Sequence, residues 1–412
     1  MAHSHSHAHR HGPSRVAVAR GPVTVLLMFL ALSAVATVVA VSMLWPDSAK
    51  VAKLREQAQF AAPGVTFVKA TVESVQKACP TEPGAEPTGP ASTDPISAPA
   101  CGTVAAVVSS GPESGSTQQV GVPTAVADSG LARGDTVRLM RVPGTSGAAA
   151  TYSFDEVIRL KPLWILWVAF IVVVALVARL RGILALISLG FGGLVLLKFM
   201  LPALLSGSSG MAVSLAGSAA IMFVVLYLAH GPSIRTSAAL AGTLLGVGVT
   251  AAVGQIAING SNLSGFADEG TALLSAFAGS LSFQGLFTCA LVIAGLGVLN
   301  DVTITQASAV WELREAAPET SRRDLFTSAM RIGRDHIAST IYTIVFAYAG
   351  SALAVLLLLS LYDRPIFDLL SSESIAEEIV RTLASGIGLV LAVPITTLIA
   401  ALTVVGPVKP EN

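Results

Sequence analysis

Long apolar runs alternate with short polar segments from about residue 163 to the end of the chain. Each run is about as long as an α-helix must be to cross the hydrocarbon core of a bilayer, which is about 30 Å thick. One more apolar run lies near the N-terminus. Because it is longer than the core of a cleaved signal peptide, we interpret it as an anchor helix. The pattern predicts about eight spanning helices, at residues 22–45, 163–180, 182–202, 210–230, 234–258, 284–306, 335–361 and 377–405.

A polar region separates the first predicted helix from the second. It contains short runs rich in Val and Thr that are separated by Gly, Pro and Asp, which is the pattern of strands joined by turns. We expect a small β-barrel or sandwich of about four to six strands there. Cys79 and Cys101 bracket a low-complexity segment within this region. A disulfide between them is expected in an oxidising compartment, and the alternative is two unpaired thiols.

Composition also indicates an integral membrane protein. Hydrophobic residues make up 53% of the chain and charged residues only 12%, and the mean hydropathy is +0.72. The 25 basic and 25 acidic residues cancel, so no overall field favours nucleic acid. The predicted fold is mainly α, a polytopic transmembrane helical bundle with a small β-rich domain. The expected domains are a His-rich leader (1–21), an anchor helix (22–45), the β-rich domain (46–161), a transmembrane helical domain (162–405) and a tail (406–412).

The distribution of Lys and Arg predicts the orientation, because short basic loops stay in the cytoplasm. Basic residues precede the first helix and lie between the second and third, the fourth and fifth, and the sixth and seventh, whereas the other loops are mainly acidic. We therefore expect both termini in the cytoplasm and residues 46–161 outside it. Lys198 and Arg381 depart from this pattern, and we interpret them as long side chains that extend outward from helix ends.

Histidines occupy alternate positions at the N-terminus: His3, His5, His7, His9 and His11. Neutral imidazoles bind metal ions, and an extended chain with His at every second position would chelate Zn²⁺, Ni²⁺ or Cu²⁺ loosely. A flexible leader makes an unselective site, so its expected role is limited to metal regulation or delivery. No other cofactor is expected.

Polar residues continue the helix predicted at 284–306 without a turn signal. The apolar "LFTCALVIAGLGVL" runs directly into "NDVTITQASAVWELREA". Spacings of three and four residues place one set of small and polar residues on a single helix face. That set is Ala294, Gly297, Asp301, Thr305, Ser308 and Glu312. The next helix carries Asp335 and Thr340 on adjacent stripes, with Arg334 beside them, and offers partners for this face.

The depth of Asp301 decides between two interpretations. Counted from residue 284 at 1.5 Å per residue, Asp301 lies about 25 Å into the membrane. A carboxylate at such depth costs about 2.5–3.5 kcal/mol unless it is paired, hydrated or protonated, and such residues usually mark ion or proton pathways. The alternative is that Asp301 lies at the interface and pairs with Arg331 or Arg334.

Three ordered segments carry a resemblance to a known family: "GVLNDVTITQASAVWELRE", "RDLFTSAMRIGRDHIASTIYTIVFAYAGSAL" and "EEIVRTLASGIGLVLAVPITTLIAA". They resemble the YibE/F-like bacterial membrane proteins over roughly residues 160–405. The resemblance implies a multi-helix protein of the bacterial cytoplasmic membrane and carries over Asp301, Glu312, Arg334 and Asp335. Asn300, Thr303 and Thr305 depart from the family pattern and make this face more polar. A weaker likeness, at fold level only, is to the proton-driven SecD and SecF permeases.

Two functional classes follow from these features. The first is a secondary transporter or permease of an unknown solute, coupled to a proton or cation through polar faces of the sixth and seventh helices. The alternative is a scaffold or sensor that couples the β-rich domain to a cytoplasmic partner through the basic segment 314–334. Expected partners are the lipid bilayer, the unknown solute or ion, and a second copy or a partner protein. An enzyme is not expected, because the metalloprotease, hydrolase and phosphate-binding motifs are absent.

Overall fold

The computed structural model describes residues 16–57, 64–77, 102–144, 149–267, 269–279, 281–361 and 365–407. The N-terminal histidines, Cys79 and Cys101 lie outside these ranges, so the structure says nothing about the metal or disulfide predictions. The chain divides into two compact units. We call Ala58–Val173 the β unit, and Met1–Gln57 together with Val174–Asn412 the helical unit.

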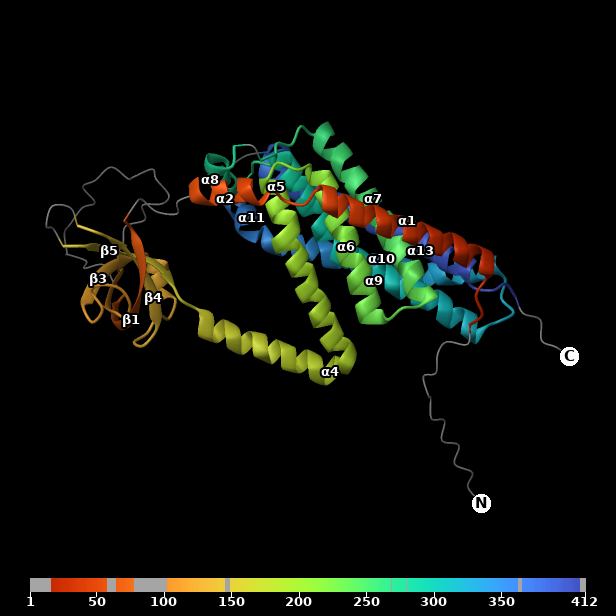
Figure 1. Cartoon of the computed structure of the whole chain (residues 1–412), viewed down its shortest axis with the longest axis horizontal. Coiled ribbons are helices and arrows are strands. Elements are labelled where there is room, and N and C mark those ends of the chain that lie inside the picture. Colours follow the sequence, from red (N-terminus) through yellow and green to blue (C-terminus); the bar gives the residue numbers. More distant parts are fainter. Residues whose placement is uncertain are drawn as a thin grey trace, which may run out of the picture. The chain divides into compact units, whose positions relative to one another are not determined.

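The β unit contains one five-stranded antiparallel sheet with the strand order β3-β2-β1-β4-β5. Its elements are β1 (Thr66–Gln76), β2 (Gly102–Val108), β3 (Thr117–Val122), α3 (Thr124–Asp128), β4 (Thr136–Val142) and β5 (Thr151–Val157). The edge strands β3 and β5 also lie against each other, so the sheet curls on itself (Figure 1). The expected small β-rich domain of four to six strands is therefore confirmed.

Alternation of side chains explains why these strands form the sheet. In β2 every second residue is buried, beginning with Gly102 and ending with Val108. The buried residues of β1 to β4 are alanine or have branched side chains: Val68, Ala70, Val72, Val104, Ala106, Val108, Val120, Val122, Val137 and Leu139. Such residues fit the inner face of a strongly curled sheet. β1 contains an irregularity between Val72 and Ser74 that increases its bend.

The helical unit consists almost entirely of long helices. Its elements are α1 (Arg20–Met43), α2 (Ser48–Gln57), the larger part of α4 (Leu160–Val195), a π-helical turn (Leu196–Met200), α5 (Leu201–Leu205), α6 (Gly210–His230), α7 (Ile234–Gly260), α8 (Glu269–Phe277), α9 (Phe283–Ala316), α10 (Arg322–Ser351), α11 (Leu353–Ser360), α12 (Ile366–Leu370) and α13 (Glu373–Thr403). Six candidate spans of the described chain are long and apolar enough to cross a membrane, or seven if the bent pair α10 and α11 counts as one.

Two of the expected helices fall in one continuous element. The segments predicted at 163–180 and 182–202 both belong to the helical stretch Leu160–Leu205, which counts as one candidate span. The break expected between them is present as a backbone bend at Arg179, where φ is 53° and ψ is −138°. Because only this one residue leaves the helical region, no loop separates the two halves.

The polar segment after residue 300 is helical, as its spacing predicts. α9 continues from Phe283 to Ala316, and only residues 317–321 separate it from α10. Ser321 caps α10 by accepting a hydrogen bond from the backbone N of Asp324 at 3.1 Å. Arg314 closes the connection by donating to the carbonyls of Pro318 and Thr320 at 2.9 and 2.7 Å. The basic segment expected as the loop 314–334 is thus mostly helix.

Three helices form the centre of the helical unit. α7, α9 and α13 lie side by side and contact one another along much of their length (Figure 1). α6 and α10 pack on the outside of this group, and α1 packs on α6 and α7.

The segment before α1 pairs with the segment after α13. Val18, before α1, forms an antiparallel β-bridge with Val404, after α13. Ala19 N donates to Thr403 O at 2.8 Å, and Val405 N donates to Ala17 O at 2.9 Å. Arg322 at the start of α10 donates from Nη2 to Val404 O at 2.9 Å. The start of α1, the start of α10 and the end of α13 therefore lie at one end of the bundle, which we call the terminal end.

Candidate functional site

A group of buried hydroxyls lies where α7, α9 and α13 meet. We call it the hydroxyl seam, and it consists of Thr243 and Thr250 of α7, Thr303 of α9, and Ser385 and Thr396 of α13. None of the five is more than 2% exposed. A hydroxyl in an apolar helix core is costly unless it has a hydrogen-bond partner, so each of these groups needs a physical account.

Two of the hydroxyls rest against glycines of the facing helix. A β-carbon added to Gly242 of α7 would overlap Thr396 Oγ1 of α13, and one added to Gly388 of α13 would overlap Thr250 Oγ1 of α7. The two contacts mirror each other, because α7 and α13 run in opposite directions and each carries Gly and Thr eight residues apart. Midway between them a β-carbon on Gly246 would lie 3.0 Å from Ala392 Cβ. Small residues at this crossing let the two backbones approach closely.

The seam contains both satisfied and unsatisfied hydroxyls. Thr243 Oγ1 and Thr303 Oγ1 form a hydrogen bond of 2.6 Å between α7 and α9, and Thr243 also donates to Ala239 O at 2.9 Å. In contrast, the oxygens of Thr250, Ser385 and Thr396 form no hydrogen bond with the described residues. These three groups have donor and acceptor capacity that the packed helices do not use.

The predicted stripe of α9 faces away from the seam. Asp301 and Glu312 are exposed, and Thr305 and Ser308 are half-buried. The buried polar residues of this helix are Thr303 and others on its opposite side, including Gln306, which donates from Nε2 to Ala329 O of α10 at 2.8 Å.

The structure brings together one pair across α9 and α10. Asp301 Oδ2 lies 3.7 Å from Nε2 of His336, which forms an ion pair only when the imidazole is protonated. Arg334 and Asp335 are exposed on α10, whereas Thr340 is buried and donates to its own helix at His336 O, 2.8 Å away. The pairing of Asp301 with Arg331 or Arg334, the interfacial alternative, is not among the ion pairs of the described chain.

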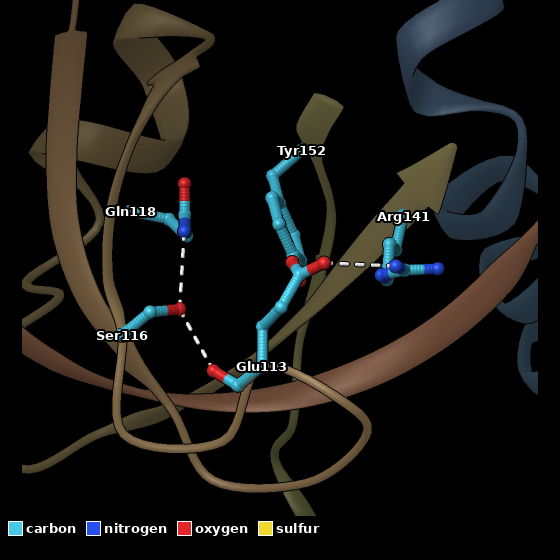
Figure 2. Close-up of polar contacts among 5 residues, drawn as sticks. All are labelled: Glu113, Ser116, Gln118, Arg141 and Tyr152. Atoms are coloured by element: carbon cyan, nitrogen blue, oxygen red, sulfur yellow. Dashed lines mark hydrogen bonds and ion pairs between the residues drawn. The ribbon is translucent and has the colours of Figure 1, made fainter. Parts of the chain in front are cut away.

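The β unit contains a second polar cluster, shown in Figure 2. Glu113, in the turn between β2 and β3, accepts hydrogen bonds from Arg141 of β4 at 2.8 Å and from the hydroxyl of Tyr152 of β5. Ser116 donates to the backbone O of Glu113 at 2.8 Å, and Gln118 donates to Ser116 Oγ at 3.1 Å. The hydrogen bond from Arg141, followed by that from Tyr152, lowers the pKa of Glu113. This cluster links the β2–β3 turn to β4 and β5, and we interpret its role as structural.

No metal centre is formed by the residues that the structure describes. Groups of three or more His, Cys, Asp or Glu side chains close enough to hold an ion do not occur among them. Cys289 is buried and unpaired in α9, where it packs as a small apolar residue.

The hydroxyl seam was not predicted from the sequence, because the predicted site was built around charged residues and the seam contains none. A signal was present: "GTLLGVGVT" of α7 and "GLVLAVPIT" of α13 share Gly at the first position and Thr at the ninth. The repeat places a small residue and a hydroxyl on one helix face, two turns apart.

Comparison with known proteins gave one match. A family model described as YibE/F-like protein matches residues 166–406. No curated protein and no solved structure matches the chain.

Proposed function

The chain belongs to the YibE/F-like family, as its three sequence segments indicate, and we propose that it is a membrane transporter coupled to a proton or another cation. The transport path in this proposal is the hydroxyl seam between α7, α9 and α13. The predicted basic loops support a place in the bacterial cell membrane with both termini in the cytoplasm.

The observation that carries the proposal is the set of unpartnered hydroxyls at the helix crossing. Thr250 and Thr396 are fully buried and their oxygens form no hydrogen bond among the described residues. An unsatisfied buried hydroxyl costs about 1–3 kcal/mol, which tight packing alone does not require. If α13 moves away from α7, both hydroxyls gain partners from an entering hydrated ion or polar solute. The closed packing therefore stores part of the free energy that favours opening.

Glycines make such a movement feasible. The crossing contains three glycines, Gly242, Gly246 and Gly388, which have no side chain. The backbones of α7 and α13 therefore lie close together there. Only a few side chains need to change rotamer when such helices slide or separate.

Asp301 and His336 supply the coupling group in this proposal. Their side chains lie 3.7 Å apart, from Oδ2 to Nε2, on the α9 and α10 face outside the seam. We assign the coupling proton or cation to this pair, because a carboxylate and an imidazole can both bind one. Asp335 and Thr340 remain coupling candidates on α10.

Flux in energised membrane vesicles tests the proposal. Vesicles that contain the protein carry a pH gradient, and a pH-sensitive dye reports whether the gradient collapses when each of a panel of polar solutes is added. We expect at least one solute to collapse the gradient, and expect Thr250→Val and Thr396→Val to slow this about tenfold. Valine keeps the side-chain shape but removes the hydroxyl.

The matched control is Thr397→Val, next to Thr396 on α13. Thr397 is equally buried, but its hydroxyl already donates to Val393 O of its own helix at 2.7 Å. Its flux should stay within about twofold of wild type. The transport proposal fails if wild-type vesicles behave like empty ones with every solute, and a stable partner captured without flux would then favour a scaffold or sensor.

A further inference from the structure

Arg381 places a guanidinium inside the helical unit, far from the terminal end. It lies eight residues after the start of α13 at Glu373, which corresponds to about 12 Å along the helix. Its side chain is 25% exposed, its Nη1 lies 3.4 Å from Glu378 Oε1, and its Cζ lies 5.4 Å from the ring centre of Phe287 in α9. The sequence suggested that this side chain extends outward from the helix end. In the structure it packs between helices instead.

The surroundings of Arg381 leave polar atoms unused. Arg381 Nε and Glu378 Oε2 are buried and form no hydrogen bond with the described residues. Ser385, one turn further along α13, is 2% exposed. Its hydroxyl lies beside the phenol of Tyr348 of α10 without forming a well-shaped hydrogen bond. Arginine, carboxylate, phenol and serine hydroxyl thus meet where α9, α10 and α13 join, and Ser385 also belongs to the hydroxyl seam.

A purely structural ion pair does not account for this arrangement. At 3.4 Å the contact between Arg381 and Glu378 is longer than the usual 2.7–2.9 Å of a charge-assisted hydrogen bond, and it uses one nitrogen of the guanidinium. A partly buried charge is costly unless its donors are satisfied. A guanidinium offers two parallel N–H donors to a carboxylate, and Nε is one of the atoms suited to that role.

We propose that Arg381 binds the carboxylate of a small monoanionic solute and that Glu378 takes up a proton from the solvent when it releases Arg381. The inference rests on the proposed transport function and names the class of its solute. The incoming carboxylate replaces Glu378 as the partner of the guanidinium, and the proton forms an O–H bond on the Glu378 carboxylate. Solute and proton together carry no net charge, so no additional charge is left in the apolar site.

The acidic surroundings favour a monoanion over a phosphate dianion. Glu377 is buried on the same helix one residue before Glu378, and Tyr348 is the titratable group that α10 presents here. α9 contributes the apolar ring of Phe287. With two carboxylates and one guanidinium in the cluster, a second negative charge on the ligand would be repelled.

Binding to the whole purified protein tests the site without reference to flux. The melting temperature is measured with increasing propionate, lactate or benzoate, with chloride as the comparison, at about pH 5.5 and about pH 7.5. We expect at least one carboxylate to raise the melting temperature, and to do so at a lower concentration at the more acidic pH.

Variants separate the site from general effects of anions. Arg381→Lys keeps the charge but loses the paired donors, so its half-saturating concentration should rise about tenfold or more. Glu378→Gln should still bind the carboxylate and lose the pH dependence. Arg331→Gln, at an exposed position of α10, should behave as wild type.

The proposal is overturned if none of the three carboxylates raises the melting temperature above the chloride value, or if Arg381→Lys binds as wild type does. Carboxylate binding that depends on Arg381 without any flux would uphold the site and contradict the transport function. Flux without such binding would uphold the transport function and contradict the carboxylate site.

Discussion

At the scale of single residues, the crossing of α7 and α13 depends on glycines that have no space for a side chain. A β-carbon at Gly242 or Gly388 overlaps the hydroxyl of the facing threonine. We expect Gly242→Ala and Gly388→Ala to lower the stability of the protein by about 1–3 kcal/mol, because overpacking forces the helices apart. Thermal unfolding of the purified protein in detergent measures the change.

Neighbouring glycines provide the controls for this prediction. Gly248 of α7 and Gly386 of α13 have no atom of another group within 4 Å of an added β-carbon. Gly248→Ala and Gly386→Ala should be neutral or slightly stabilising, since alanine favours a helix more than glycine does. Removing the hydroxyl with Thr396→Ala should partly restore Gly242→Ala. If all four glycine variants lost the same stability, the close approach would not be the cause.

The hydrogen bond between Thr243 and Thr303 should couple α7 to α9 energetically. Thr243→Val and Thr303→Val each leave one buried hydroxyl without this partner, so the double variant should cost less than the sum of the two. Between membrane helices such bonds average about 0.6 kcal/mol and reach about 1.7 kcal/mol. A double-mutant cycle by thermal unfolding measures the coupling, and a value near zero would show that the contact of 2.6 Å does not contribute.

The sequence predicts which residues of α9 share a face, but not which face is buried. Spacing alone places Asp301, Thr305, Ser308 and Glu312 together, and their partial to full exposure agrees with one outward side. Apolar residues surround much of this helix, so its pattern has no clear direction. The burial of Gln306 depends on Gly333 of α10, because a β-carbon added there would lie 3.0 Å from Gln306 Oε1.

Among the secondary-structure elements, those of the β unit show that the local sequence pattern predicts strands but not every contact between them. Four Val- and Thr-rich runs marked the regions of β1 to β4, because branched side chains and turn residues act locally. The contact of β3 with β5 was not predictable in this way. Glu113, in the turn before β3, accepts hydrogen bonds from Arg141 of β4 and Tyr152 of β5, which lie 28 and 39 residues further along the chain.

The same cluster makes the β unit sensitive to acid. The pKa of Glu113 is lowered in the folded protein, first by the hydrogen bond from Arg141 and then by that from Tyr152. A group with a lowered pKa stabilises the fold above its unfolded pKa of about 4.5, and this contribution is lost as the pH falls through the folded value. Glu113→Gln should therefore loosen β3 and β5 at neutral pH, with a difference from wild type that disappears in strong acid.

Hydrogen exchange of the whole protein measures this effect strand by strand. Wild type and Glu113→Gln are compared at the same pH, so that the intrinsic exchange rates cancel. Glu73→Gln, at an exposed position of β1, is the control and should exchange as wild type does at every pH. Equal protection of β3 and β5 in wild type and Glu113→Gln at neutral pH would contradict the prediction.

At the scale of the whole molecule, the family match and the seam cover the same part of the chain. The match spans residues 166–406, which includes α7, α9 and α13 but not the five-stranded sheet. The helical unit was predictable because a membrane span needs a long apolar run. The number of crossings was harder to predict, since composition does not show whether a bent helix such as Leu160–Leu205 crosses once or twice.

From the β-bridge between Val18 and Val404 we expect an even number of membrane crossings. A chain that enters and leaves a membrane on the same side has crossed it an even number of times. Arg322 binds Val404 O at the terminal end, and α13 starts at the opposite end, so we count α10 and α11 together as one expected crossing. The candidate spans then add up to seven, which is odd. An even count requires two crossings within Leu160–Leu205, and we expect the chain to turn at the bend at Arg179.

Thiol labelling tests this parity in a background without the native cysteines. Leu180→Cys, beside the bend, should react with a membrane-impermeant reagent from the side of the two termini, and Ser208→Cys, between α5 and α6, from the other side. Reaction of both cysteines from one side would contradict two crossings within Leu160–Leu205. With eight crossings, we expect Arg179 and Arg181 on the same side as Arg20 and Arg322. Two backbone hydrogen bonds between the segments before α1 and after α13 thus predict the membrane side of a turn more than 150 residues away from either partner.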